Sequence, residues 1–236
     1  MNISRNFLSA MIMNPGNIAQ DKSGSSSRSS QLTLISTNNL QDFLRTRRSI
    51  RRFKPDPVPD SVIENILTTA AFAPSAHNRQ PWRFCVVTDL SVKENLANAM
   101  ATEFERDLEK DGLPHAEIQK RISRSRERII SAPVVIILNV DMSDMDIYPD
   151  EKRAKAEYLM AVQSVANAGV QLLLATHAEG LGGVWVCSPL FVQGTIQNIL
   201  DLPKTWEPQA MFFLGYPQDI PEVRERKTLN TIVIRR

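Results

Sequence analysis

The chain has 236 residues, of which 42% are hydrophobic and 23% charged, so it can bury the full core of a soluble globular domain. Its net charge of +2 provides no general attraction to nucleic acid or to a membrane surface, and any basic function has to be local. Cys85 and Cys187 both fall in apolar, strand-like segments, which predicts two buried thiols rather than a disulfide.

Residues 1–38 are expected to form a flexible tail, and residues 39–236 a single domain. The tail contains a polar run, Ser-Gly-Ser-Ser-Ser-Arg-Ser-Ser at Ser23–Ser30, that is unsuited to packing in a core. The three histidines lack metal-ligand spacing, and no apolar run approaches the length of a membrane span. We therefore expect a cytoplasmic protein with no metal site and no membrane anchor.

Periodicity and turn signals predict a mixture of helices and strands. The first helix begins at Asn38 or Asn39, and capping-box patterns at Ser61–Glu64 and Ser91–Glu94 open the next two. Further helices are expected after Pro114, at Glu151–Ala178 and at Ser188–Leu200, with strands at Arg83–Thr88, Pro133–Val140, Val184–Cys187 and Ala210–Tyr216. The strands are mostly apolar, which indicates an α+β or α/β domain with a covered central sheet.

Two basic runs stand out in a chain of nearly neutral charge. The first contains five arginines at positions 45, 47, 48, 51 and 52 around Ser49, and is either a solvated helix end or an anion site built from guanidinium forks. The second follows Pro114 and has few apolar residues, which predicts a surface helix; its basic residues are Lys120, Arg121, Arg124, Arg126 and Arg128. Nucleic-acid binding there is disfavoured, because acidic residues are mixed in and no aromatic stacking platform accompanies them.

The loop from Ala73 to Trp82 reads Ala-Pro-Ser-Ala-His-Asn-Arg-Gln-Pro-Trp. Two prolines prevent the preceding helix and the following strand from running through it. Its five consecutive or near-consecutive polar side chains favour a loop that holds a polar ligand, although a plain capping turn is the simpler alternative.

Four motifs in this order resemble the nitroreductase superfamily of FMN-dependent enzymes: Arg47-Arg-Ser-Ile-Arg51, Pro74-Ser-Ala-His-Asn-Arg-Gln-Pro-Trp82, Gly180-Leu-Gly-Gly-Val-Trp185 and Arg224-Glu-Arg226. The resemblance covers about residues 40–236. It implies an α+β, nitroreductase-like fold: a mostly antiparallel central sheet covered by helices, with a C-terminal extension that embraces a partner subunit. In its amino-acid sequence, the second motif is most similar to the flavin domain of coenzyme F420 γ-glutamyl ligases.

The resemblance also implies a homodimer with FMN at its interface. Arg47, Arg48, Ser49 and Arg51 match positions that hold the phosphate and the polar edge of the flavin, where an arginine would stabilise the charge that develops on reduction. Pro74, Ser75, Ala76 and Asn78 match the stretch contributed by the other subunit. Arg224 and Arg226, with Lys227 as a possible third, match a phosphate-binding pair, and the backbone of Val186, Cys187 and Ser188 matches the segment facing the flavin N5 edge.

By this resemblance the chain passes hydride from NAD(P)H through FMN to an electron-poor acceptor such as a nitroaromatic, quinone or enone, with no catalytic side chain required. Reduction of a deazaflavin precursor, a flavin-binding protein without nicotinamide turnover, and a nucleic-acid-binding protein are the alternatives. Two departures from the family pattern matter: Ala76 stands where many members have a second serine, and Pro189 lacks a backbone N–H. Trp82 and Trp185 are expected to serve packing at least as much as ligand contact.

Overall fold

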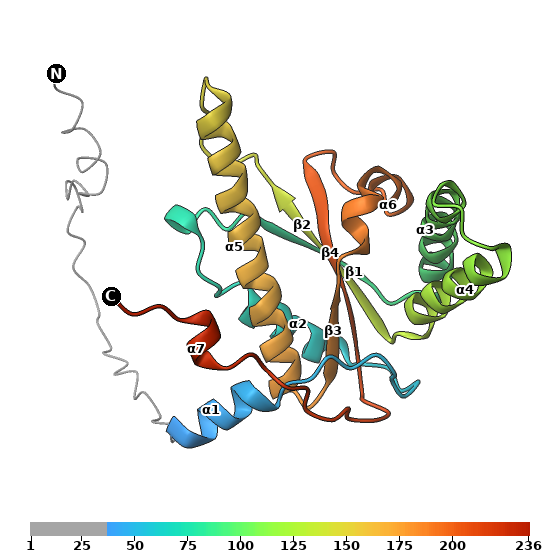
Figure 1. The fold of residues 1–236 in the computed structure, drawn as a ribbon, viewed down its shortest axis with the longest axis horizontal. Coiled ribbons are helices and arrows are strands. Elements are labelled where there is room, and N and C mark those ends of the chain that lie inside the picture. The colour runs from blue at the N-terminus through green and yellow to red at the C-terminus, as the bar shows by residue number, and fades with distance from the viewer. Residues whose placement is uncertain (1–36) are drawn as a thin grey trace, which may run out of the picture. The chain divides into compact units, whose positions relative to one another are not determined.

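The computed structural model describes residues 37–236, so most of the tail expected over residues 1–38 lies outside the described residues. Figure 1 shows the order of the elements in this part of the chain. The helices are α1 (Thr37–Thr46), α2 (Asp60–Ala70), η2 (Ala76–Asn78), α3 (Leu90–Lys110), α4 (His115–Ser131), α5 (Glu151–Ala178), η3 (Ser188–Phe191), α6 (Gln193–Ile199) and α7 (Leu229–Ile232). The strands are β1 (Trp82–Val87), β2 (Val134–Asp141), β3 (Gly182–Val186) and β4 (Trp206–Gly215).

The four strands form one antiparallel sheet in the order β1-β2-β4-β3. The central strand β2 is buried at every position, as its continuous apolar sequence predicts for a strand covered on both faces. Val134 of β2 lies opposite Leu214 of β4. The other edge of β4 pairs with β3, where Phe213 of β4 lies opposite Val184 of β3. The predicted fold class, a helix-covered and mostly antiparallel sheet, is confirmed.

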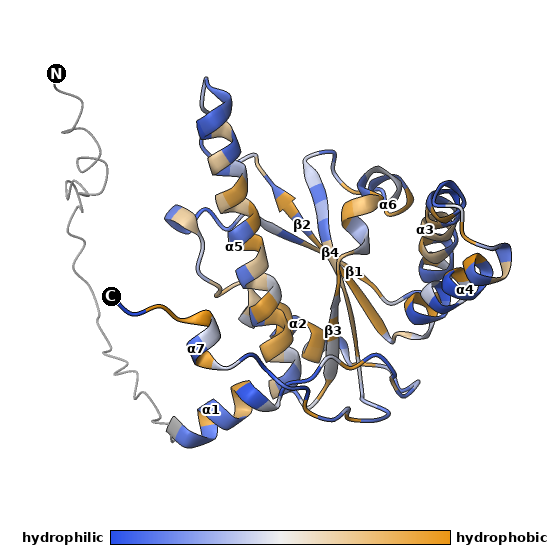
Figure 2. Cartoon of the chain, viewed as in Figure 1, coloured by the Kyte–Doolittle hydropathy of each residue, from blue (hydrophilic) through white to orange (hydrophobic). Residues whose placement is uncertain are grey.

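Alternate residues of each strand point to opposite layers of the core. Ile136 and Leu138 pack with α2 and α5, whereas Val135 and Ile137 pack with α3, α4 and α6. Figure 1 shows these two groups of helices on opposite faces of the sheet, and Figure 2 shows the apolar residues gathered on the strands and on the inner sides of the helices. The sheet is therefore the middle layer of three.

The long helix α5 has the bounds that the sequence predicts, Glu151–Ala178. It packs closely on the sheet at Gly169, where an added Cβ would lie 2.4 Å from Cζ3 of Trp185. By length and composition α5 could cross a bilayer, so the expectation that no segment reaches that length was wrong. Its apolar residues nevertheless form part of the buried core, as in the central helix of a soluble domain. Trp82 and Trp185 both pack in this core, which confirms their predicted packing role.

Both predicted capping boxes are wrong. The helix α2 begins at Asp60 with Pro59 at its N-cap, and no side chain caps it. The helix α3 is capped by Asp89, whose Oδ1 accepts from the Val92 N–H at 3.0 Å and from the Ser91 hydroxyl at 2.5 Å. Asp89, two residues before Ser91, caps the helix instead because a carboxylate is a stronger acceptor and is favoured at the positive helix N-terminus.

The single helix expected from Ser188 to Leu200 is two pieces, η3 and α6. Val192 separates them with an extended φ of −141° while its N–H donates to the Pro189 carbonyl at 3.1 Å. The strand before them, β3, ends at Val186, so Cys187 lies in the turn rather than in the sheet. This break turns the chain sharply at the end of β3.

The C-terminal segment leaves the sheet after β4. Pro217 forms an isolated bridge with Phe53, and Gln218 donates its N–H to the Arg52 carbonyl at 3.1 Å. Residues 218–236 are exposed throughout, including the apolar side chains of Ile220 and Ile234. That this extension embraces a partner subunit stays a prediction.

Candidate functional site

The arginine-rich segment after α1 runs along the start of β3. Ile50 donates its backbone N–H to the Gly183 carbonyl at 3.0 Å, and Ser49 forms an isolated parallel bridge with Gly183. The close approach requires a glycine at position 182, since a Cβ on Gly182 would lie 2.6 Å from Ile50 Cγ1. The backbone on either side of Ser49 is therefore held against the sheet, and the neighbouring arginines are placed at its edge.

Arg47 is the basic residue that this placement buries in part. Its Nη1 atom is buried and has no hydrogen-bond partner among residues 37–236. Burial lowers the pKa of Arg47, and the positive charges of Arg226 and Arg48 lower it further. The fold thus brings Arg226 of the C-terminal segment close to the first basic run. These converging guanidinium groups, one with an unused buried donor, are suited to an oxyanion such as a phosphate.

Three other arginines of the predicted phosphate site donate to nearby backbone carbonyls. Arg48 donates to the Arg45 carbonyl at 2.7 Å and to the Arg47 carbonyl at 3.0 Å. Arg51 donates to the Ser49 carbonyl at 3.3 Å, and Arg226 to the Arg224 carbonyl at 3.4 Å. A guanidinium has five N–H donors, so one or two such bonds leave most of them free for a ligand.

A cavity of about 460 Å³ adjoins these arginines, between the end of α5 and the C-terminal segment. Arg47, Arg48 and His177 all line it. The His177 ring stacks on Phe43 with centroids 4.9 Å apart, and its Nε2 lies 3.2 Å from the Thr46 hydroxyl. Burial lowers the pKa of His177, and the charges of Arg47 and Arg48 lower it further. The sequence offered no signal for this residue, because it approaches the arginines only through the fold.

The loop between α2 and β1 has an unusual backbone. His77, Asn78 and Gln80 have φ values of 50°, 54° and 50°, the left-handed region that favours glycine. Each costs about 1–2 kcal/mol in a residue with a side chain. Such strain is retained where surrounding contacts over-determine it, and it clusters at functional sites.

Contacts with the middle of α5 hold this loop in place. The Ala76 N–H donates to the Ser164 hydroxyl at 3.1 Å, and the Asn167 amide donates to the Pro74 carbonyl at 3.1 Å. Ser164 and Asn167 precede His177 by ten to thirteen residues of one helix, which is about 15–20 Å at the helical rise. The loop is therefore far from the arginines of its own chain.

Within the loop, the Ser75 hydroxyl accepts from the Gln80 N–H at 3.1 Å, and the Asn78 side-chain oxygen accepts from the Gln80 amide at 3.2 Å. Arg79 pairs with Asp146 at 2.5 Å on the surface. The loop is thus a preformed structure that presents short polar side chains. The hydrogen bonds and the ion pair named above stay within the loop or reach Asp146, and do not involve the arginine-rich segment after α1.

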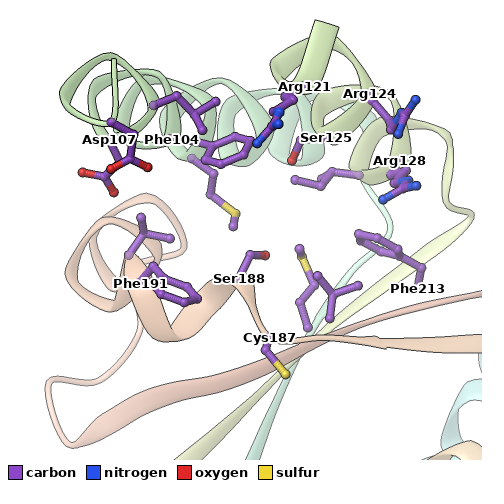
Figure 3. Close-up of a pocket in the computed structure, with 17 residues that line it drawn as sticks. Phe104, Asp107, Arg121, Arg124, Ser125, Arg128, Cys187, Ser188, Phe191 and Phe213 are labelled. Carbon is purple, nitrogen blue, oxygen red and sulfur yellow. The ribbon is translucent and has the colours of Figure 1, made fainter. Parts of the chain in front are cut away.

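A larger cavity, of about 660 Å³, opens at the other end of β3 (Figure 3). Its floor contains Val186, Cys187 and Ser188, the segment expected to face a flavin. Its walls come from α3, α4, η3 and β4, and its volume is within the range of small-molecule sites. Cys187 is exposed here, so its predicted burial was wrong; the turn after β3 places it outside the sheet.

The second basic run, which the sequence predicts to lie on a surface helix, lines this cavity. Arg121, Arg124 and Arg128 of α4 all border it. Their spacing of three and four residues indicates a common helix face, which was available from the sequence. What that face meets depends on how α4 packs against α3, which the spacing does not reveal.

The fold and these features define a class: an α+β protein with an antiparallel sheet, a basic edge at the start of β3 and a largely apolar cavity at the end of the same strand. The profile of the nitroreductase family, described as "Nitroreductase family", matches residues 44–216. The chain therefore belongs to the nitroreductase family.

Two relatives and one solved structure illustrate this membership. The chain is 31% identical over 212 residues to a Thermus thermophilus NADH dehydrogenase, covering 80% of this chain and 91% of that protein. It is 29% identical over 202 residues to the Drosophila melanogaster iodotyrosine deiodinase, covering 83% and 69%. The Vibrio harveyi NADPH:FMN oxidoreductase complexed with NAD⁺ has the same fold, with a TM-score of 0.63 at 20% identity, covering 84% of this chain and 77% of that one.

Proposed function

We propose that this protein is an FMN-dependent oxidoreductase that passes hydride from NAD(P)H to an electron-poor acceptor such as a nitroaromatic, quinone or enone. The observation that carries the proposal is the buried Nη1 of Arg47, which has no hydrogen-bond partner in the described part of the chain and lies beside the charges of Arg226 and Arg48. A protein that gathers positive charge in a partly buried place gains free energy from a bound dianion. Family membership and the names of relatives that act on nicotinamides support the redox assignment.

The residues present fit FMN. Arg47, Arg48, Ser49, Arg224 and Arg226 would hold the phosphate, with Arg51 providing positive charge at the polar edge of the ring. The backbone of Val186, Cys187 and Ser188 would face the ring, since β3 separates this turn from the arginines by about 13 Å of extended chain. When bound, FMN supplies the two-electron redox chemistry.

The residues of the chain itself bind and orient the reactants, and no acidic or basic side chain is assigned a proton transfer. Each turnover oxidises one NAD(P)H to NAD(P)⁺, and the acceptor gains that hydride and one proton from solvent. The large cavity is apolar over much of its wall, which excludes water from the reacting pair. Donor and acceptor would occupy it in turn, giving ping-pong kinetics.

A homodimer is part of the proposal. Pro74, Ser75, Ala76 and Asn78 would reach the flavin of the partner subunit, and the C-terminal extension would pack on that subunit. The separation of the loop from the arginines of its own chain supports this arrangement, and so does its strained, preformed backbone. We further propose a single cytoplasmic domain over residues 39–236, and no role in binding nucleic acid.

A second candidate function is reduction of a deazaflavin precursor. It rests on the amino-acid sequence of the Pro74–Trp82 loop, which is most similar to the flavin domain of coenzyme F420 γ-glutamyl ligases. A flavin-binding protein without nicotinamide turnover is the third candidate. The three share the FMN site and differ in the donor and the acceptor.

An absorbance spectrum of the purified protein tests the proposal. We expect a yellow protein, or a colourless one that becomes yellow when titrated with FMN, that anaerobic NADH or NADPH bleaches. Bleaching by dithionite alone would favour the candidates without nicotinamide turnover. A protein that takes up no FMN at all would contradict every flavin assignment.

A further inference from the structure

We propose that the large cavity selects acceptors that carry an anionic group, which Arg124 and Arg128 of α4 hold. The inference rests on the proposed function, because it names the substrate class of the same site. It concerns the second basic run, which neither the phosphate assignment nor the packing of the core uses.

The two arginines lie on the cavity side of α4. Figure 3 shows Arg124 and Arg128 together at one end of the cavity, with the ring of Phe213 beside them. Ser125 lines the same stretch and adds a hydroxyl between them in the sequence. Positions 124 and 128 are one helical turn apart, so both guanidinium groups can contact one anion.

The guanidinium groups of Arg124 and Arg128 are available to bind a ligand. Arg121, on the same face, pairs with Glu117 at 2.8 Å. Within the described part of the chain, Arg124 and Arg128 form neither an ion pair nor a side-chain hydrogen bond. Both arginines are exposed to solvent, and both border a concave site with largely apolar walls. Low-dielectric walls concentrate the field of such charges on a ligand.

Charged side chains of opposite sign lie at the two ends of the cavity. Asp107 of α3 and Asp111, the residue after this helix, also line it, and Figure 3 places Asp107 at the end opposite Arg124 and Arg128. Asp107 is paired with Lys110 at 3.5 Å, so part of its charge is offset. An acceptor with one anionic group would therefore enter with that group toward the arginines.

The space between the two ends suits a planar, conjugated body. Phe104 of α3 and Phe213 of β4 are aromatic walls, and Met100 and Ile129 add apolar contact. Below them lies the Val186–Ser188 turn that is proposed to face the flavin. The acceptor class is thus an aromatic or conjugated molecule with a carboxylate or phosphate at one end.

Comparing 4-nitrobenzoate with its neutral isostere 4-nitrobenzamide tests the inference on the FMN-loaded protein. In both, the first two-electron step converts nitro to nitroso, releases water and oxidises one NADPH. We expect kcat/KM to favour the carboxylate by about tenfold or more, as for one hydrogen bond to a charged group. The Arg124→Gln/Arg128→Gln protein should lose this preference. Its kcat/KM for the amide should change less than about twofold, because the neutral amide forms no hydrogen bond between charged groups with the two arginines.

Arg126→Gln is the matched control. Arg126 is on the same helix, is exposed and does not line the cavity, so this variant removes one equal charge and should keep the preference. Equal FMN content and equal thermal midpoints in all variants show that they are folded. A wild-type enzyme that turns over both acceptors equally would overturn the inference and leave the proposed function intact.

The donor is itself anionic, so its kinetics decide between the two sources of negative charge. If the double variant raises KM for NADPH as much as for 4-nitrobenzoate, the arginines hold the donor phosphates and the acceptor assignment is overturned. If the protein takes up no FMN, the proposed function fails, and calorimetry with 2-naphthoate and 2-naphthamide still tests the anion site. Tighter binding of the naphthoate that the double variant loses supports the site, and equal binding overturns it.

Discussion

The two ends of β3 have opposite physical character. At its start, which we call the arginine end, Gly182 and Gly183 contact the segment that positions Arg47 beside Arg226. At its finish, which we call the cavity end, Val186 leads into a space walled by apolar side chains. The arginine end is short of negative charge, whereas the cavity end is continuous with the buried core.

This difference separates residues that hold a ligand from residues that hold the fold. At the arginine end, like charges repel in the free protein and only a bound anion relieves them. At the cavity end, the same side chains serve the wall and the core. Substitutions of the arginines at the arginine end should therefore change binding more than stability, and substitutions of the buried apolar side chains in the cavity wall should do the reverse.

The largest expected effect is at the cavity end. Phe213 lines the cavity but is only 3% exposed, so Phe213→Ala should lower the free energy of unfolding by roughly 3–5 kcal/mol, as for other buried aromatics. Phe191 lines the same cavity and is 81% exposed. Phe191→Ala, measured in the same urea titration, should change stability by less than about 0.5 kcal/mol. Equal effects would show that the wall is not part of the core.

The next effect is at the arginine end. Arg47→Ala should weaken FMN binding by about 10- to 100-fold, since a hydrogen bond to a charged group is worth roughly 1.5–3 kcal/mol. The thermal midpoint of the FMN-free protein should not fall, because the variant removes the repulsion from Arg226. Flavin fluorescence and a thermal melt measure the two quantities.

Arg45→Ala is the control for that variant, as it removes the same charge from the exposed end of α1. It should leave FMN affinity nearly unchanged. Arg226→Ala should behave as Arg47→Ala does. Unchanged flavin content in both Arg47→Ala and Arg226→Ala would refute the phosphate assignment.

A third substitution tests how the arginine end is attached to β3. A Cβ at Gly182 would lie 2.6–2.8 Å from three atoms of Ile50, so Gly182→Ala must displace the segment that carries the arginines. We expect a loss of about 1–3 kcal/mol in stability, the usual cost of overpacking, together with weaker FMN binding. Gly194→Ala has open space around its Cβ and should cost nothing in chemical denaturation. Full stability in Gly182→Ala would mean that the segment is not held by this contact.

The smallest expected effect is a pH dependence from His177. Because the pKa of His177 is lowered in the folded state, the unfolded state binds more protons between the two pKa values. The stability of the FMN-free protein should therefore fall as the pH drops through the unfolded-state value of about 6.5. His177→Gln should flatten this slope, and bound FMN should reduce it. A slope of the opposite sign in a melting series would contradict the assignment.

Several elements were predictable because local patterns specify them. The bounds of α5 follow from its apolar length and from Asp150, which caps its first turn through the Arg153 N–H at 3.0 Å. The buried strand β2 follows from a continuous apolar run. The caps of α2 and α3 were not predicted correctly: α2 begins after Pro59 without a side-chain cap, and at α3 the carboxylate of Asp89 takes the capping position in place of Ser91.

Some residues of the candidate site could likewise be predicted from the sequence, and others could not. The motifs around Arg47, Ser75 and Arg226 were recognised as likenesses to a family, and the fold brings Arg47 and Arg226 together. Arg124 and Arg128 were seen only as part of a basic surface helix. His177 was not noticed, because it meets the arginines across more than a hundred residues of chain.

By itself the sequence determined the helices and strands, their mixed class and the charge of each segment, because these depend on residues a few positions apart. The tertiary structure alone decided which charges converge. Among residues 37–236, it left a buried donor of Arg47 without a hydrogen-bond partner, and it turned one face of α4 toward an apolar cavity. Burial and long-range contact set the cost of a charge, and both arise only when distant segments pack together.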